Sequence, residues 1–467
     1  MFLRQIIDPS LAQHAYLIGC PRSGEAILID PERDLDRYFR LAAENDLRIV
    51  AVADTHIHAD YLSGARELMQ RHGALAYLSA EGGPDWQFEW AKQHAHARWL
   101  RDGDRFCVGN VEFNVRLTPG HTPEHLSFLV FDADADEPMA VLSGDFLFVG
   151  DVGRPDLLES AAGQVGEMEP AARALFASLR ATASWPDHLQ LLPGHGAGSA
   201  CGKALGAVST SVLGYERKFN PALRQAMAGN EAGFVRDILA GQPEPPLYFA
   251  RMKRDNRRGP TLLADGQLPS PNRLPVAALN PWIGCRGCAM LDLRTDAGAF
   301  LQQHVKGALF TPLRGGQLPI AAGSYVKEDE RILLLLEHEG QLDEAVRQLI
   351  RIGLDRVEAW LPVAEALKAG ATGSLPRIHA TALPKGVCVL DVRYADEHAD
   401  ERLRGARHIA HTRLAERLAD VPADCSLYVH CASGERAAIA SAFLAREGRD
   451  VVVVQGGLDD VPKARKT

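Results

Sequence analysis

Cysteine is scarce in this chain, with only eight in 467 residues. Secreted domains that depend on disulfides are much richer in cysteine, so the composition excludes a disulfide scaffold, and we expect each cysteine to be a thiol. Apolar runs are also short. None reaches the roughly 20 residues of a membrane-spanning helix, and the first residues lack the pattern of a signal peptide. We therefore expect a cytoplasmic protein with no membrane partner.

Positive charge is in deficit as well, because 51 Lys and Arg residues face 60 Asp and Glu residues, for a formal net charge of -9. This balance argues against a nucleic-acid partner. The one basic cluster, Arg251 to Arg258, is expected to be a solvated loop. An apolar content of 46% and a charged content of 24% are ordinary for globular proteins. The length favours about three domains.

The strongest positive signal is the stretch Thr55 to Asp60, which places His56, His58 and Asp60 within five residues. Ile49 to Val52 is typical of a short buried strand, so the stretch forms the loop at its C-terminal end, where open α/β sheets hold their functional groups. Two histidines separated by one residue can turn both rings toward a common metal ion. Taken alone, the same spacing is also typical of surface or capping residues.

Three later loops of this region carry similar groups. A Pro-Gly turn precedes His121, a Ser-Gly pair precedes Asp145, and a second Pro-Gly turn precedes His195. Four such loops in one domain are hard to ascribe to chance. The alternating pattern around them predicts helices at Arg37–Asn45 and Ala65–His72, and strands at Ala26–Ile29, Ile49–Val52, Ala76–Leu78, Val111–Leu117, Leu126–Val130 and Ala140–Leu142.

Taken in this order, the four loops resemble the metallo-β-lactamase fold, an αββα sandwich with its metal site along one edge. The resemblance covers about half of the chain. Family members that hydrolyse esters with two metals carry a histidine directly after the aspartate of the first motif. This chain has Tyr61 there. The resemblance therefore implies that a second metal lacks a ligand, and it favours one metal.

The run from Gly144 to Asp156 resembles the persulfide dioxygenases of that superfamily, which hold a single Fe(II). By motif position, this resemblance implies His56, His121 and Asp145 as the ligands of one Fe(II) in the domain. Two histidines and one carboxylate leave three adjacent positions open, as an iron oxygenase needs for substrate and O2.

The same resemblance assigns roles to residues around the metal. His58, Asp60 and His195 are candidates to orient the ligands, with loop stabilisation as the alternative for each. Arg154 matches the family arginine that binds glutathione, and a planar guanidinium can grip a carboxylate. A structural ion pair is the other interpretation. Cys201 lies on a glycine-rich segment and is either a persulfide-handling thiol or a merely buried one.

The domain organisation follows from composition and from an internal repeat. Residues 1–240 form the metallo-β-lactamase-like domain, and a proline-rich tether spans 241–272. Beyond it, Leu291-Asp292-Leu293-Arg294 is echoed by Leu390-Asp391-Val392-Arg393, a period of roughly one hundred residues. Both copies, at 273–372 and 376–467, resemble rhodanese domains. The expected fold class is α/β and α+β multidomain, with an αββα metallo-β-lactamase sandwich followed by two rhodanese-like parallel-sheet α/β domains.

The two rhodanese-like copies differ where chemistry would occur. In the second, the predicted strand 426–430 leads into Cys431-Ala432-Ser433-Gly434-Glu435-Arg436 and then a helix. Backbone N-H groups at such a loop favour a thiolate. The loop resembles the rhodanese active loop, which implies Cys431 as nucleophile and Arg436 as anion contact. A buried, inert cysteine is the alternative. In the first copy Glu337 occupies the cysteine position, so we expect that copy to be a pseudo-rhodanese.

The Cys285-x-x-Cys288 pair carries only a weak redox or metal signal. As a whole, the sequence predicts an Fe(II)-dependent dioxygenase that oxidises a low-molecular-weight persulfide, such as glutathione persulfide, with O2 to sulfite and thiol. Rhodanese sulfur transfer involving thiosulfate would accompany it. The alternatives are a glyoxalase II-like zinc thioester hydrolase with a sulfurtransferase tail, and a non-catalytic sulfur carrier. Homo-oligomer formation is left open.

Overall fold

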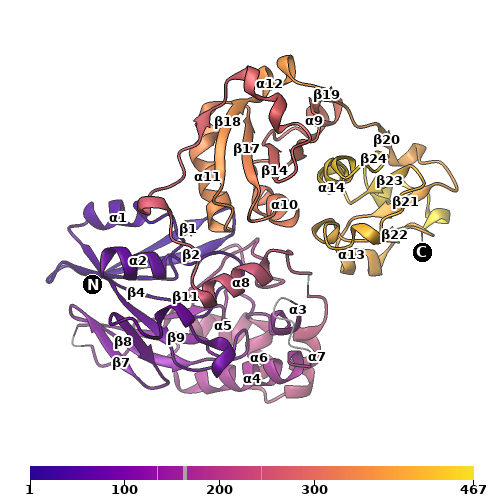
Figure 1. The fold of residues 1–467 in the computed structure, drawn as a ribbon. Coiled ribbons are helices and arrows are strands. Elements are labelled where there is room, and N and C mark those ends of the chain that lie inside the picture. The colour runs from indigo at the N-terminus through magenta and orange to yellow at the C-terminus, as the bar shows by residue number, and fades with distance from the viewer. Residues whose placement is uncertain (134, 161–165, 243, 467) are drawn as a thin grey trace. The chain divides into compact units, whose positions relative to one another are not determined.

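The computed structural model describes residues 1–133, 135–160, 166–242 and 244–466. It divides into two compact units, Met1–Gly266 and Gln267–Thr467 (Figure 1). Pro243, inside the predicted tether, lies outside the described residues. Among the helices that are described, none is long and apolar enough to cross a membrane.

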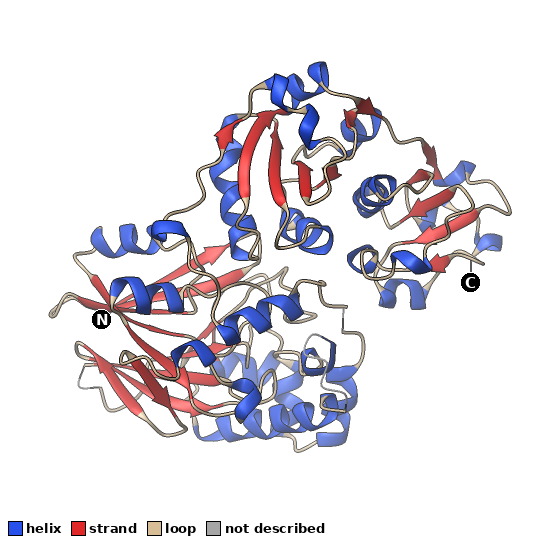
Figure 2. Cartoon of the chain, viewed as in Figure 1, coloured by secondary structure: helices blue, strands red, loops and turns tan. Residues whose placement is uncertain are grey.

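The first unit is built on two six-stranded sheets, seen as two sets of red arrows in Figure 2. Successive side chains of a strand point to opposite faces of the sheet, so one strand can contribute residues to two separate cores. In β4, for example, Ala51 and Ala53 face the core between the sheets, while Val52 faces the helices outside. In spatial order the first sheet contains β1 (Phe2–Asp8), β2 (Gln13–Cys20), β3 (Glu25–Ile29), β4 (Arg48–Ala53), β5 (Leu75–Ser79) and β6 (Ala97–Leu100). The second contains β12 (Ser211–Val212), β11 (Gln190–Pro193), β10 (Ala140–Gly144), β9 (Leu126–Asp132), β8 (Val111–Leu117) and β7 (Arg105–Val108).

Helices cover the outer face of each sheet. Tyr38 and Leu68, from α1 and α2, pack on the first sheet, and Leu175 and Phe234, from α4 and α7, pack on the second. The layers are therefore helix, sheet, sheet, helix, and the predicted αββα fold is confirmed. The helices of this unit are α1 (Asp36–Ala43), α2 (Ala65–His72), α3 (Leu157–Ser160), α4 (Met168–Ala181), α5 (Leu213–Phe219), α6 (Pro221–Met227), α7 (Glu231–Leu239) and α8 (Phe249–Arg258).

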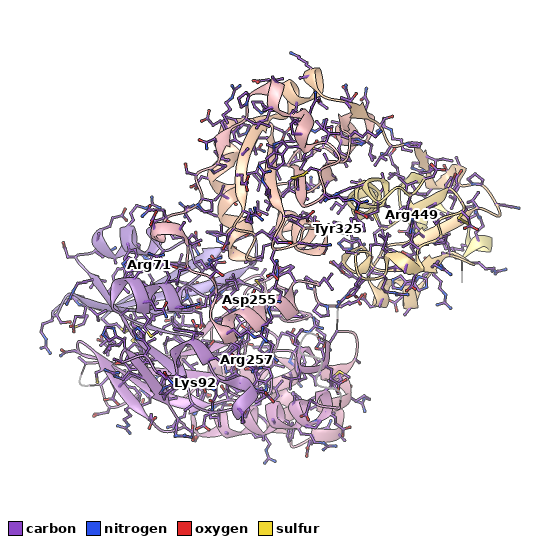
Figure 3. All side chains as sticks on the ribbon, in the orientation of Figure 1. Arg71, Lys92, Asp255, Arg257, Tyr325 and Arg449 are labelled. Carbon is purple, nitrogen blue, oxygen red and sulfur yellow. A yellow bond between two sulfur atoms is a disulfide. The ribbon has the colours of Figure 1, made fainter. Side chains whose placement is uncertain are left out.

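The basic cluster at Arg251 to Arg258 is not a solvated loop, so that expectation was wrong. It forms most of α8, whose labelled residues Asp255 and Arg257 appear in Figure 3. Met252 and Asn256 are buried on one face, four residues apart, while the charged residues between them lie on the exposed or half-buried side. Charged residues outnumber apolar ones in this segment, so the sequence did not reveal its helical periodicity.

The second unit contains the same five-stranded parallel sheet twice. The strand order of the first copy, β13-β18-β17-β14-β16, corresponds element by element to β20-β24-β23-β21-β22 in the second. The first copy consists of β13 (Asn272–Arg273), β14 (Cys288–Asp292), α9 (Ala297–Gln302), β15 (His304–Val305), β16 (Leu309–Phe310), α10 (Gln317–Tyr325), β17 (Arg331–Leu336), α11 (Leu342–Arg351), β18 (Val357–Pro362), α12 (Val363–Ala369) and β19 (Thr372–Gly373). The second consists of β20 (Arg377–His379), β21 (Cys388–Asp391), α13 (Ala395–Asp400), β22 (Arg407–His408), β23 (Leu427–His430), α14 (Glu435–Arg446) and β24 (Val451–Gln455).

The repeated Asp-x-Arg motif has a structural cause. Arg294 pairs with Asp292 through Nε and Nη2 at 2.9 and 2.7 Å, and Arg393 pairs with Asp391 at 3.0 and 2.6 Å. The Nη2 of each arginine also donates to a backbone carbonyl farther along the chain. In each copy, this buried ion pair thus fixes the loop that follows the strand ending in the aspartate, β14 in the first copy and β21 in the second.

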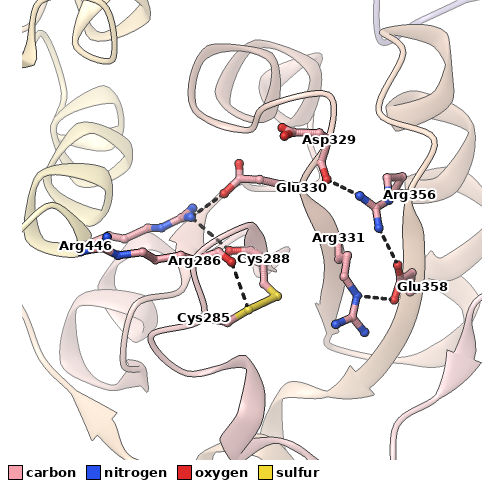
Figure 4. The surroundings of a disulfide bond; sticks show 9 residues. All are labelled: Cys285, Arg286, Cys288, Asp329, Glu330, Arg331, Arg356, Glu358 and Arg446. Carbon is pink, nitrogen blue, oxygen red and sulfur yellow. Dashed lines mark hydrogen bonds and ion pairs between the residues drawn. A yellow bond between two sulfur atoms is a disulfide. The ribbon is translucent and has the colours of Figure 1, made fainter.

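Four of the cysteines are paired, which corrects the expectation that each is a separate thiol. Cys285, in the turn before β14, is bonded to Cys288, the first residue of that strand, as Figure 4 shows, and Cys388 is bonded to Cys425. The second pair is 37 residues apart in the chain. It becomes possible because Cys388 lies opposite Leu427 in the register of the neighbouring strands β21 and β23.

Candidate metal centre and sulfur-transfer site

The loop after β4 is held by a carboxylate from another part of the chain. Asp30 follows β3, and its Oδ1 accepts from the backbone N-H of Thr55 at 2.7 Å, while its Oδ2 accepts from the Thr55 hydroxyl at 2.9 Å. The Thr55 oxygen lies 2.9 Å from Nδ1 of His56. Since Nδ1 is engaged in this way, the His56 ring is left with Nε2 directed at the site.

His56, His121 and Asp145 come together with all three side chains buried, and their ligand atoms lie within 4.8 Å of one another. Nε2 of His56 is 4.0 Å, and Nε2 of His121 3.5 Å, from Oδ2 of Asp145. The Nδ1 of His121 is held by the carbonyl of Arg154 at 3.0 Å. Among the described residues, Asp145 Oδ2 has no hydrogen-bond partner although it is buried. An orphaned carboxylate oxygen facing two imidazole nitrogens fits a bound cation.

The electrostatics of these three residues suit a divalent metal. Burial lowers the pKa of both His56 and His121, so each ring is neutral and offers a lone pair. Burial acts in the opposite sense on Asp145, but His195 holds the pKa of that carboxyl well below its usual range. The set therefore supplies two neutral nitrogens and one anionic oxygen.

His58 does not join the group of His56, His121 and Asp145. Its Nε2 lies 3.1 Å from Asp30 Oδ1 and 3.1 Å from the hydroxyl of Tyr61, and the two rings are 4.5 Å apart. Although burial acts to lower it, Asp30 raises the pKa of His58 to about 9. A protonated imidazole cannot bind a metal. Tyr61, the residue that departs from the two-metal pattern, thus helps to turn His58 away from the site.

Asp60, His195 and Cys201 form a second buried group. The imidazole of His195 bridges two carboxylates, with Nδ1 at 2.8 Å from Asp145 Oδ1 and Nε2 at 2.7 Å from Asp60 Oδ2. Burial opposes protonation of this ring, yet the two carboxylates raise the pKa of His195 well above its usual value. Burial also raises the pKa of the Cys201 thiol, so Cys201 is not activated as a thiolate here.

Arg154 lies fully buried and its guanidinium is already engaged. Nε and Nη2 donate to the two carboxylate oxygens of Asp156 at 2.8 and 2.6 Å, and Nη1 donates to the carbonyl of Ala200 at 3.0 Å. Its own carbonyl orients His121. Of the two interpretations of Arg154, this geometry favours the structural ion pair over direct contact with a substrate.

Two positioning residues escaped the sequence analysis. Asn256 of α8 is buried, accepts from the N-H of Ser63 at 2.9 Å, and donates to the carbonyls of His58 and Tyr61 at 2.8 and 2.6 Å. His125 accepts from the N-H of Asp145 at 3.0 Å through its Nε2. The only advance signal for Asn256 was the i, i+4 spacing with Met252. His125 could have been suspected because it closes the turn that carries His121.

In the second unit, Cys431 follows β23 and is fully buried. Its Sγ accepts from the backbone N-H of Gly434 at 3.1 Å and of Ala437 at 3.4 Å, at the start of α14. Gly434 has φ of 101°, a conformation that favours glycine and gives the loop its tight turn. Two amide donors and a helix N-terminus stabilise a sulfur that carries negative charge.

Arg436 is paired rather than free. Its Nη1 and Nη2 lie 2.5 and 2.8 Å from the carboxylate oxygens of Glu397. In the first copy, Glu337 follows β17 at the position that Cys431 takes after β23, and it is exposed. A carboxylate there cannot carry a sulfane sulfur.

Comparison with known proteins gives the following relatives. Residues 9–195 match the model of the metallo-beta-lactamase superfamily, and residues 377–464 match that of the rhodanese-like domain. The mitochondrial persulfide dioxygenase ETHE1 of Bos taurus is 32% identical over 167 residues, and that of Homo sapiens 32% over 166, in each case 35% of this chain. The chain spans 59% of the length of each of these relatives. A solved metallo-beta-lactamase of Staphylococcus aureus is 37% identical with a TM-score of 0.67, and the match covers 78% of this chain and 99% of that one.

Proposed function

Because the chain belongs to the metallo-beta-lactamase superfamily and also carries a rhodanese-like domain, we propose that it is an Fe(II)-dependent persulfide dioxygenase joined to a thiosulfate sulfurtransferase. The relatives of its first unit support sulfur chemistry, and the buried histidine and aspartate group supports metal binding. One observation carries the dioxygenase proposal. The site offers two neutral histidines and one carboxylate, while His58 is turned away by Asp30 and Tyr61.

His56, His121 and Asp145 would hold the Fe(II). When bound there, a ferrous ion would supply the one-electron chemistry that lets O2 react with a closed-shell persulfide. The overall reaction takes one persulfide, one O2 and one water to one thiol and one sulfite, with release of protons. The substrate would be a low-molecular-weight persulfide, with glutathione persulfide as the first to test.

The chain's own residues have definable tasks in this reaction. Asp145 receives a hydrogen bond from His195 at its Oδ1, so only Oδ2 is available to the metal. Among the described groups, Oδ1 of Asp60 is buried with no partner, so it can accept a hydrogen bond from the water that the reaction consumes. His195, between the two carboxylates, is placed to hold a proton close to that water.

The sulfurtransferase step would take place at Cys431. Its thiolate attacks the outer sulfur of thiosulfate, the S-S bond of thiosulfate breaks, and sulfite leaves with the bonding electrons. The persulfide anion left on Cys431 would be stabilised by the N-H groups of Gly434 and Ala437. Residues 273–372, with Glu337 in place of a nucleophile, would form a non-catalytic domain.

Oxygen consumption with glutathione persulfide, on protein of known iron content, tests the proposal. We expect O2 uptake in proportion to bound iron, with one sulfite formed per O2. A glyoxalase II-like zinc hydrolase would instead cleave a glutathione thioester without O2. A sulfur carrier would load sulfur on Cys431 and consume no O2. Either result would overturn the dioxygenase proposal.

A further inference from the structure

A cavity of about 450 Å³ lies at the Cys431 loop, and residues from both rhodanese-like copies line it. Ser433, Gly434 and Glu435 come from the active loop, whereas Asp296 and Arg314 come from the copy without a cysteine. The pseudo-rhodanese copy therefore forms part of the wall of a cavity that borders the Cys431 loop, while Cys431 itself is buried behind Gly434 and does not line the cavity. Its most direct contribution is the ion pair between Nη2 of Arg314 and Oε2 of Glu435, at 2.6 Å.

Glu435 is an unfavourable residue for an anion-handling loop. It is the first residue of α14, next to Gly434, whose N-H donates to the sulfur of Cys431. Its Oε1 is buried and has no hydrogen-bond partner within the described part of the chain. A carboxylate at this position repels thiosulfate, which carries two negative charges. Arg436 cannot offset this charge in full because it is already paired with Glu397.

Asp296, the other carboxylate that lines the cavity, opposes the binding of an anion less than Glu435 does. Asp296 accepts from the N-H groups of Gly298 and Ala299 at 2.7 and 3.2 Å, so its charge is partly satisfied by the backbone. Arg314 is thus the cation that pairs with Glu435 at the cavity. The pair is partly exposed, with 56% of the arginine and 28% of the glutamate side chain accessible, so its effect is moderated by solvent.

Contacts elsewhere along α14 also join it to the first copy. Tyr325, labelled in Figure 3, stacks on Phe443 of α14 at 4.4 Å with an interplanar angle of 9°, and its hydroxyl donates to the carbonyl of His411 at 2.7 Å. Farther along α14, Arg446 pairs with Glu330 at 2.8 Å and donates to the carbonyl of Cys288 (Figure 4). The helix whose N-terminus faces Cys431 is therefore packed directly on the first copy.

We propose that Arg314 is a specificity-determining residue of the Cys431 site. By neutralising Glu435, it allows a dianionic sulfur compound such as thiosulfate to reach the loop. The inference rests on the proposed sulfurtransferase activity and gives the copy without a cysteine a role in it. Arg314 does not touch the reacting sulfur, so its effect belongs to the binding of the anion rather than to the transfer step.

The test measures thiosulfate:cyanide turnover on the full chain at low and high salt. We expect Arg314→Ala to raise KM for thiosulfate about three- to tenfold at low salt, with kcat retained and the effect reduced at high salt. In the double variant Arg314→Ala/Glu435→Gln, KM should return to that of Glu435→Gln alone. Arg446→Ala is the matched control, because it removes another ion pair between the same two copies without changing the charge at the loop. It should leave KM for thiosulfate unchanged.

The other possible outcomes would overturn the inference. If the double variant is as impaired as Arg314→Ala, or Arg446→Ala raises KM equally, Arg314 acts through packing and the inference is overturned. An unchanged KM in Arg314→Ala also overturns it. If the wild-type chain turns over no thiosulfate, the sulfurtransferase proposal itself fails and this inference fails with it.

Discussion

Replacement of Asn256 by alanine tests the idea that a residue in the predicted tether shapes the metal loop. The amide side chain of Asn256 makes three hydrogen bonds to backbone groups of His58, Tyr61 and Ser63, and only 2% of the residue is exposed. Alanine removes all three. It leaves two carbonyls and one N-H without their partner in a buried region.

The expected cost follows from these contacts. A buried polar group left unsatisfied costs about 1–3 kcal/mol, and water entering the vacated space recovers part of this. We therefore expect a local destabilisation of about 3–5 kcal/mol. Since about 1.4 kcal/mol corresponds to a factor of ten, the amide of Ser63 should exchange with deuterium at least about a hundredfold faster. Affinity for Fe(II) should fall about 10–100-fold, because the loop carries His56.

Hydrogen exchange by mass spectrometry on the full chain reads this loop separately from the second unit. Asn230→Ala is the matched control. Asn230 is exposed and caps α7, where its Oδ1 accepts from the N-H of Gly233 at 3.1 Å, and losing a cap costs about 1 kcal/mol. If Asn256→Ala changes exchange at Ser63 no more than Asn230→Ala does, the three hydrogen bonds of Asn256 do not hold the loop and the proposed role of Asn256 is refuted.

Four further outcomes follow from the two sites. Asp145→Asn should lower O2 uptake at least about a thousandfold and leave thiosulfate turnover intact, as oxygen electrode and cyanide assays will show; parallel loss would contradict separate sites. Cys431→Ser should abolish thiosulfate turnover and leave O2 uptake intact in the same two assays. Metal removal by a chelator should abolish O2 uptake, with recovery on Fe(II) but not on Zn(II) addition; recovery with zinc would favour a hydrolase. Asp156→Ala should destabilise the first unit by about 3–5 kcal/mol in hydrogen exchange, because Arg154 keeps a buried unpaired charge, and a cost under about 1 kcal/mol would show that Arg154 is not held by this pair.

The loops of the metal site were accessible to sequence analysis because each follows a strand with a strong apolar pattern. The strand at 111–117 and the helix at 65–72 have the predicted bounds. The direction of each ring was not accessible. His56 and His58 lie two residues apart in one loop, and their rings differ in direction because Thr55 engages one ring while Asp30 and Tyr61 engage the other.

The cysteines show the same limit. A count of eight excludes a disulfide scaffold, yet it says nothing of individual pairs. Cys388 and Cys425 meet because β21 and β23 are neighbours in a parallel sheet, which is a non-local pairing. Helix α8 was missed because its apolar positions are few and its charges many.

By itself, the sequence determined the identity of the chemical groups and their place at strand ends, because strand periodicity and loop residues are local properties of the chain. It also determined that one rhodanese-like copy has a cysteine and the other a glutamate. Only the tertiary structure decided which side chains share one point in space. The hydrogen bonds of Asn256, the rotation of His58 and the pairing of Arg314 with Glu435 all join residues far apart in the chain, and such contacts exist only after the sheets and helices have packed.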